Sequence, residues 1–308
     1  MCTALFLKQS HLFGRTLDVS RSYGESAVIV PRGFPFPFRH SPICTDHPAI
    51  LGIARIEDGV PLFFDGMNEY GLAAAGLNFP GYAVYHAAKT GHAAASYEFI
   101  PWILCHCRTL ADVRVLLEDT GITSDSFRDD LPPTPLHWMI ADPDGALTVE
   151  QTADGLQIFE NTVGVLTNSP PFPYHMTRLC DFMACGDAQP DNRLYPQVSL
   201  IPCSNGMGSI GLPGDFSSAS RFARAAFMAS HAPSDSGIDD FFHRLDCVSI
   251  PRGCVTAEDG GHFTAYASCA DLSGIAYHFT TYSCRSIRSI HLNDEDADGC
   301  TLTRFDMS

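Results

Sequence analysis

Cys2, which directly follows the initiator Met1, is the strongest candidate for a catalytic nucleophile. Its side chain is small enough for Met1 to be trimmed, which leaves a thiol and a free α-amine on one residue. An α-amine titrates at about pH 8, so near neutrality it can take the thiol proton directly or through water. The resulting thiolate attacks carbonyl carbons. Position alone does not separate this role from that of an ordinary residue in a first strand.

Two charged residues follow one predicted hairpin later, in the stretch Gly14-Arg15-Thr16-Leu17-Asp18. Antiparallel pairing of the first two strands brings both beside Cys2. There Arg15 can stabilise the thiolate by its charge, and Asp18 can accept a hydrogen bond from the amine. Taken alone, an Arg and an Asp at a strand end are more often a surface ion pair.

The elements that must position these residues come in the order strands, helices, strands, helices, strands. The predicted strands are 3–7, 11–17, 26–30, 50–55, 61–65, 72–77, 136–141, 147–151, 156–159, 163–166, 263–268, 274–279 and 286–292. The predicted helices are 96–107, 110–118, 174–185, 217–229 and 238–245. Long βαβ units are missing from this order, so it favours two mainly antiparallel sheets with helices outside, in one domain over residues 1–308. The proline-interrupted stretch 33–38 is expected to be an exposed aromatic loop.

Composition excludes several classes of partner. The formal net charge is −16, which disfavours nucleic acid and anionic membranes. No apolar run reaches the length of a membrane span, and the first residues lack the pattern of a signal peptide, so we expect a cytoplasmic protein. The 12 cysteines are expected to be mostly reduced. Cys105-His106-Cys107 lacks a second ligand pair at zinc-finger spacing, so no metal is expected.

Further motifs run through nearly the whole chain and, with Cys2 and Arg15, resemble the choloylglycine hydrolase family. That family contains conjugated bile salt hydrolases and penicillin V acylases. The motifs are Met1-Cys2-Thr3, Gly14 to Asp18, Tyr23-Gly24-Glu25, Pro31-Arg32-Gly33, Asn68 to Leu72, Gly76 to Gly81, Thr134 to Trp138, Gly164 to Pro170, Gly211 to Phe222 and Val248 to Gly253. Their order and extent make the resemblance more specific than any single motif.

The resemblance implies an α+β fold, the four-layer αββα sandwich of N-terminal nucleophile hydrolases, and a reaction without a cofactor. It implies that Cys2 is the nucleophile, with Arg15 and Asp18 beside it. Asn168 then corresponds to an oxyanion-hole amide, with a backbone N–H near Asn78 as the second donor. Arg221 corresponds to an arginine that stabilises the charged reacting groups. Oxyanion donors suit this chemistry because the amide oxygen becomes anionic in the tetrahedral intermediate.

The resemblance also bears on the substrate and the assembly. In the family, asparagine at position 78 is typical of bile salt hydrolases and tyrosine of penicillin V acylases, so Asn78 favours conjugated bile salts. Val19 departs from relatives that carry tryptophan there. Leu17, Phe79 and Leu136 are candidate walls of the apolar pocket that a steroid needs. The segment 189–213 resembles an inter-subunit loop and predicts a homotetramer.

Two alternatives stay open at this point. The first keeps the mechanism and changes the substrate to penicillin V or an acyl-homoserine lactone. The second is a thiol-rich redox or metal-binding protein without hydrolase activity.

Overall fold

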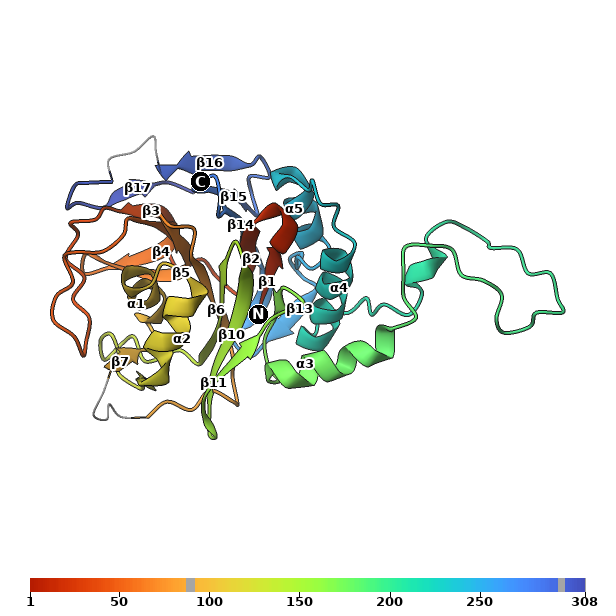
Figure 1. Cartoon of the computed structure of the whole chain (residues 1–308), viewed down its shortest axis with the longest axis horizontal. Helices are drawn as coiled ribbons and strands as arrows, with labels where there is room; N and C mark the ends of the chain where they lie inside the picture. Colours follow the sequence, from red (N-terminus) through yellow and green to blue (C-terminus); the bar gives the residue numbers. More distant parts are fainter. Residues whose placement is uncertain (87–91, 293–296, 308) are drawn as a thin grey trace.

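The first large sheet carries the N-terminus on β1, an interior strand next to its edge. The computed structural model describes residues 1–86, 92–292 and 297–307 (Figure 1). The first large sheet has seven strands and is antiparallel. In spatial order it contains β12 (Val165–Leu166), β1 (Cys2–Leu7), β2 (Leu12–Val19), β14 (Gly260–Asp271), β15 (Ala276–Thr281) and β16 (Arg288–His291), and β13 (Val255–Ala257) pairs with β14. The pairing of β1 with both β12 and β2 fixes the chain start on two sides.

The second large sheet is also antiparallel and has eight strands. Its order is β11 (Gly155–Glu160), β10 (Gly145–Thr152), β9 (Leu136–Asp142), β6 (Ala73–Asn78), β5 (Val60–Asn68), β4 (Ile50–Glu57), β3 (Ser26–Val30) and β17 (Thr303–Phe305). Between β9 and β10 the chain reverses where the Asp142 carboxylate accepts the Asp144 N–H at 2.9 Å. Aspartate stabilises turns in this way.

Helices cover the outer faces of the two sheets, which makes four layers (Figure 1). On the eight-stranded sheet lie α1 (Phe99–His106) and α2 (Leu110–Glu118). On the seven-stranded side lie α3 (Phe172–Arg178), α4 (Ser218–Ser230) and α5 (Ile238–Asp246). The expected α+β sandwich of two antiparallel sheets between helices is therefore confirmed.

Helix starts follow the capping residues, and this explains where the predicted limits hold. Ser217 caps α4 by accepting the Ser220 N–H, so the predicted start at 217 is correct to within one residue. The predicted helix 96–107 begins only at Phe99, because the Glu98 carboxylate instead accepts the Ala95 N–H in a preceding turn.

Several short elements differ from the prediction. The predicted helix 174–185 is wrong in its second half, where α3 gives way to the 3₁₀ turn η2 (Leu179–Phe182). Other 3₁₀ turns are η1 (Lys8–Ser10) and η3 (Met207–Ser209). The parallel pair β7 (His92–Ala95) and β8 (Thr120–Thr123) was not predicted. Strands of four residues are too short to show an alternating pattern.

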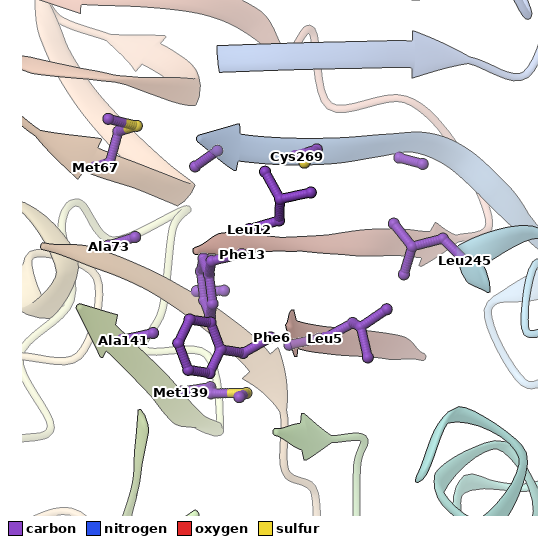
Figure 2. Close-up of a cluster of buried hydrophobic side chains, with 14 of the residues drawn as sticks. Leu5, Phe6, Leu12, Phe13, Met67, Ala73, Met139, Ala141, Leu245 and Cys269 are labelled. Carbon is purple, nitrogen blue, oxygen red and sulfur yellow. The ribbon is translucent and has the colours of Figure 1, made fainter. Parts of the chain in front are cut away.

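The largest apolar cluster lies between the two sheets and continues beneath α4 and α5. Figure 2 shows its centre, where Phe6 and Phe13 of the first hairpin meet Met139 of β9. On the other side of β1, Leu5 points toward Leu245 of helix α5 (Figure 2). Burial of this area holds β1 and β2, and with them the chain start, rigidly in place.

The aromatic loop 33–38 corrects the prediction that it is exposed. Phe34, Phe36 and Phe38 are all buried. Phe36 and Cys44 exchange two backbone hydrogen bonds of 2.9 and 3.0 Å, which folds the loop back on itself. The Phe38 ring lies 5.7 Å from that of His106 in α1. Prolines keep this stretch out of a sheet ladder, but they do not prevent its rings from packing against a helix.

One segment projects away from the sandwich. This arm, residues 183–213, leaves η2 and returns to α4 (Figure 1). It carries exposed apolar side chains, namely Met183, Leu194, Tyr195, Val198, Leu200, Ile201 and Ile210. Within the described part of the chain, no helix is long and apolar enough to cross a membrane.

Candidate active site

Cys2 is the first residue of β1, and its side chain is buried. The register of the first hairpin pairs Cys2 with Leu17 and Ala4 with Arg15. Before Cys2, Met1 exchanges two hydrogen bonds with the Asp18 backbone, at 3.0 Å from Asp18 N–H to Met1 O and 2.6 Å from the Met1 amine to Asp18 O. Antiparallel pairing therefore brings Arg15 and Asp18 beside Cys2, as the sequence predicts.

Asn168 and Arg221 reach the same point from other elements. Asn168 follows β12, whose Leu166 pairs with Ala4, and the Asn168 Oδ1 accepts the Cys2 N–H at 2.9 Å. Arg221 lies in the first turns of α4. Its Nη1 donates to the Cys2 carbonyl at 2.5 Å and its Nη2 to Asn168 Oδ1 at 2.7 Å. Two residues from separate parts of the chain, Asn168 after β12 and Arg221 of α4, thus fix the backbone of Cys2.

The hydrogen bonds of Asn168 fix the orientation of its amide. Its Oδ1 accepts from two donors, Cys2 N–H and Arg221, so this atom must be the oxygen. Its Nδ2 donates to the Asn78 carbonyl at the end of β6, at 2.8 Å. An NH₂ group has two hydrogens, so one remains for a ligand atom beside Cys2. The next backbone N–H after Asn78, that of Phe79, is bonded to the Pro135 carbonyl at 2.7 Å.

Buried charges surround this network. Arg221 is fully buried, and its Nη1 lies 3.9 Å from the Asp18 carboxylate. Burial lowers the pKa of the Arg221 guanidinium, and the charges of Asp18 and Cys2 oppose that shift. The Asp18 carboxylate accepts hydroxyl protons from Thr264 at 2.6 Å and Thr16 at 3.1 Å. With Met1 present, the nitrogen that reaches Asp18 is that of Met1, at the backbone oxygen.

Arg15 crosses from β2 to the other sheet. Its Nη1 donates to the carbonyls of Gly76 at 2.5 Å and Phe64 at 3.1 Å, and its Nε to that of Thr16 at 3.2 Å. Its Nη2 is buried without a hydrogen-bond partner among the described residues. Burial would lower the pKa of Arg15, but the charges of Cys2 and of other nearby groups outweigh it, and the pKa is raised.

A cavity of about 320 Å³ opens at the thiol. Its walls include Cys2, Arg15 and Asp18, and also the predicted wall residues Leu17 and Leu136. Asn78 and the atypical Val19 line it too. This volume falls at the lower end of the range for small-molecule sites. A larger hollow of about 740 Å³, at the base of the arm, contains none of these residues.

Phe79 corrects the predicted wall. It does not line the cavity, because side chains alternate along an extended chain and Asn78 faces the cavity instead. The Phe79 ring is fully buried and stacks on His137 at a centroid distance of 4.2 Å. His137 in turn lies within hydrogen-bond distance of the Thr167 carbonyl, next to Asn168. Phe79 therefore packs behind the site.

Much of the cavity wall was not predicted. Aromatic and apolar side chains from strand β5 and from separate loops complete it, namely Phe63 and Phe64 of β5 with Tyr23, Tyr97, Phe127 and Leu131, together with Asp259 and His262. Tyr23 lies in a stretch that the sequence analysis noted as a motif, but nothing marked its side chain as a wall. These loops are far apart in the chain, so no local spacing connects them.

Among the described residues, no His, Cys, Asp and Glu side chains form a group of three or more suited to a metal ion. The twelve cysteines are all free thiols. Cys105 and Cys107, flanking His106, are both buried.

With this geometry in view, the comparison with known proteins is decisive. Residues 2–305 match the family "Linear amide C-N hydrolases, choloylglycine hydrolase family". The chain belongs to the choloylglycine hydrolase family. Among the curated relatives, it is 38% identical to the bile salt hydrolase/transferase of Lactiplantibacillus plantarum, over 99% of this chain and 96% of that protein. It is 33% identical to the conjugated bile acid hydrolase of Lactobacillus gasseri, over 99% of this chain and 100% of that protein.

Solved structures agree with the family assignment. The conjugated bile acid hydrolase of Clostridium perfringens superposes with a TM-score of 0.93 at 34% identity, covering all of this chain and 97% of that one. The penicillin V acylase of Agrobacterium tumefaciens superposes at 0.76 with 20% identity, covering 99% of this chain and 90% of that one, which supports the fold alone. Membership in the choloylglycine hydrolase family makes this chain an amide hydrolase and removes the thiol-rich redox alternative.

Proposed function

We propose that the protein hydrolyses the amide bond of glycine- or taurine-conjugated bile salts, with Cys2 as the N-terminal nucleophile. The observation that carries this proposal is the buried thiol of Cys2 at one end of a mostly apolar cavity. Its backbone is held there by Asn168 and Arg221. The relatives named for bile salts or bile acids cover essentially the whole chain at 31 to 38% identity.

Removal of Met1 prepares the site in two ways. With Met1 attached, the nitrogen of Cys2 is an amide and has no basic lone pair. After removal it is an amine, which the Asn168 Oδ1 holds by the contact that the amide already makes at 2.9 Å. Met1 also lines the cavity, so its loss makes room next to the thiol. The amine then takes the thiol proton, and Arg15 stabilises the thiolate by its charge.

The thiolate attacks the amide carbon of the conjugate, and the carbonyl oxygen becomes anionic. The second hydrogen of the Asn168 Nδ2 is the donor best placed for that oxygen, because the first is bonded to the Asn78 carbonyl. Such a fixed donor contributes about 3 to 4 kcal/mol to transition-state stabilisation. The Cys2 amine returns the proton to the leaving glycine or taurine, and water then releases the bile acid from the thioester.

Arg221 and Asp18 position the reacting groups of Cys2 and Asn168. Arg221 fixes Asn168 and the Cys2 carbonyl at once, so the donor and the nucleophile hold their relative positions. Asp18 lies beside the chain start and accepts from two threonine hydroxyls, which leaves it oriented for the amine once Met1 is gone. These roles make both residues part of the catalytic site.

The runner-up substrates, penicillin V and acyl-homoserine lactones, use the same mechanism. Asn78, rather than tyrosine, lies at the cavity, and this favours the steroid substrate. Released amino acid should be measured with glycocholate and taurocholate, in parallel with turnover of the other two amides. We expect bile salts to be the preferred substrates. Turnover of penicillin V alone, by protein that starts at Cys2, would reject the steroid assignment and keep the mechanism.

The arm supports a homotetramer as part of the proposal. Its exposed apolar residues Leu194 and Ile201 have almost no contacts within the chain, at 89 and 84% exposure. Exposed apolar segments of this kind are typical of contacts between subunits. Light scattering should give a tetramer, and Leu194→Asp with Ile201→Asp should reduce the mass. Val115→Asp, at an exposed apolar position of α2, is the matched control. A monomeric wild type would contradict the proposal.

Two expectations complete the proposal. A cytoplasmic location agrees with the twelve free thiols, because reducing compartments keep cysteines in this state. A single domain over residues 1–308 stays a prediction, which limited proteolysis followed by mass analysis tests.

A further inference from the structure

A buried carboxylate that the mechanism above does not use lies behind Arg15. Asp65 belongs to β5, is 1% exposed and does not line the cavity. It follows Phe64, whose carbonyl accepts Arg15 Nη1 at 3.1 Å. Both charged residues are therefore in the interior between the two sheets, on facing strands, and are joined through the peptide that links Phe64 to Asp65.

Three hydroxyl groups surround the Asp65 carboxylate. Tyr266 donates to Oδ1 at 2.5 Å, Ser268 donates to Oδ2 at 2.7 Å, and Tyr277 also donates to Oδ2. All three donors come from the seven-stranded sheet, on β14 and β15. The Ser268 oxygen itself accepts the Arg15 backbone N–H at 3.3 Å, which directs the Ser268 proton to Asp65. Three hydroxyl donors on one carboxyl stabilise its ionised form, which is purely an acceptor.

The charges of Asp65 and Arg15 stabilise each other. Burial raises the pKa of the Asp65 carboxyl, and the Arg15 charge opposes that rise. Asp65 is likewise among the groups whose charge raises the pKa of Arg15. The direct acceptors of the Arg15 guanidinium are neutral carbonyls, so Asp65 is a counter-charge at a short distance and not a direct partner.

We propose that Asp65 is a positioning residue for the reaction. It holds Arg15 in place through the adjoining Phe64 carbonyl and Ser268, and its negative charge partly offsets the effect of the Arg15 charge on the Cys2 thiol. This inference rests on the proposed function, in which Cys2 is the nucleophile. The carboxylate works through Arg15 and the Tyr266–Ser268–Tyr277 hydroxyls, which connect the two sheets directly behind the site. If Asp65 had only a structural role, its substitution would weaken the packing of the two sheets but leave the reactivity of the Cys2 thiol unchanged.

The pH dependence of Cys2 alkylation separates the two roles. Asp65→Asn keeps the shape of the side chain and removes its charge, so Arg15 attracts the thiolate more strongly. The pH midpoint for iodoacetamide labelling of the Cys2 peptide, followed by mass spectrometry, should fall by about half a unit or more. In an Arg15→Met background the same substitution should no longer move the midpoint. Hydrolysis of taurocholate should lose about tenfold in kcat, because Arg15 is no longer held in position. KM should stay nearly unchanged, because Asp65 itself does not line the cavity.

Control variants keep the outcome decisive. Tyr277→Phe keeps the ring and removes one hydroxyl that stabilises the negative charge of Asp65. The labelling midpoint of Cys2 should therefore move in the same direction as in Asp65→Asn, but by less. This variant replaces Asp65→Asn in the test if Asp65→Asn does not fold. Asp142→Asn removes another buried carboxylate, one that accepts the Leu110 N–H at 2.8 Å, and should leave the midpoint in place. Unchanged midpoints in folded Asp65→Asn or Tyr277→Phe protein would overturn the proposal. Labelling needs no substrate, so this result is independent of whether bile salts are hydrolysed.

Discussion

Two layers of the molecule differ sharply in what they bury. Beneath α1 and α2, the outer face of the eight-stranded sheet packs apolar and aromatic side chains such as Phe99, Trp102 and Trp138. Around β1 and β2, the apolar cluster surrounds fully buried charges, with Arg15 between the two sheets and Arg221 on the side of α4. Charges cost free energy to bury unless they are paired and hydrogen-bonded. Their concentration around β1 and β2 therefore coincides with the proposed catalytic site.

The difference also teaches how the site is held. In the outer layer, position depends mainly on close packing, with neutral or single-carboxylate contacts such as that of Asp142 with the Leu110 N–H. In the layer around β1 and β2, position depends on a hydrogen-bonded network in which Asn168 accepts from Cys2 and Arg221 and donates to Asn78. Loss of one member leaves buried partners unpaired, which costs more than the lost bond. Substitutions in the two layers should therefore separate stability from activity.

The largest effect is expected from Arg221→Met. It removes the partner of Asn168 and leaves the buried Asp18 charge without its cation, which typically costs about 3 to 5 kcal/mol. Urea unfolding should show this loss, and hydrolysis should disappear. Arg224→Met on the same helix is the control, because Arg224 is half-buried and donates to backbone carbonyls near the arm. Equal losses in both variants would show that Arg221 has only a structural role.

Asn168→Ala should come next, with a loss in kcat of about 10²- to 10³-fold, because a fixed donor to the oxyanion is removed. Asn161→Ala is a matched control, since Asn161 is also buried but bonds Thr148 and the Val165 carbonyl away from the cavity. It should lower stability and leave kcat nearly unchanged. Similar kcat values for the two variants would remove Asn168 from the proposed oxyanion hole.

A smaller, paired effect compares the layers directly. Ile140→Val deletes one methylene group under α1 and should cost about 0.5 to 1.5 kcal/mol of stability without changing kcat. Thr264→Val keeps its shape but removes the hydroxyl that donates to Asp18 and accepts the Ile250 N–H. It should cost about 1 to 3 kcal/mol and also lower kcat. If kcat responds equally to both, the two layers do not differ in function.

The smallest effect expected is a pH dependence of stability. Burial lowers the pKa of His175, whose Nε2 donates to the Asn168 carbonyl at 2.9 Å. Below about pH 6.5 the His175 imidazole is protonated in the unfolded chain but stays neutral in the folded protein. The free energy of unfolding therefore falls as the pH falls. Between pH 7.5 and 5.5 the loss from His175 should reach at most about 1.4 kcal/mol. His175→Gln should flatten this part of the slope in urea unfolding, and an unchanged slope would contradict it.

How much of this follows from the sequence depends on the kind of pattern. The hairpin of β1 and β2 is predicted from its short turn, and its register places Arg15 and Asp18 correctly. Alternation and caps also predict most strands of the two sheets and the start of α4. The placement of Asn168 and Arg221 beside Cys2 follows only from the family resemblance, since 166 and 219 residues separate them from it.

The remainder depends on packing between distant segments. The Phe34, Phe36 and Phe38 rings are buried because α1 lies over their loop, and a proline-rich stretch carries no sign of this. Phe79 was predicted at the cavity, but the alternation of the chain turns it to the opposite side, where it packs on His137. In the sequence, Asp65 is a single polar residue in a predicted strand. Its contacts with hydroxyl groups of β14 and β15 follow only from the packing of the two sheets.

The most direct test of the account compares one protein with and without a free Cys2. A removable N-terminal tag cut directly before Cys2 gives both forms from one preparation, and intact mass reports which is present. Taurocholate hydrolysis should appear only in the form whose first residue is Cys2. Full-speed hydrolysis by the uncut form, in which the nitrogen of Cys2 is still an amide, would contradict the central claim.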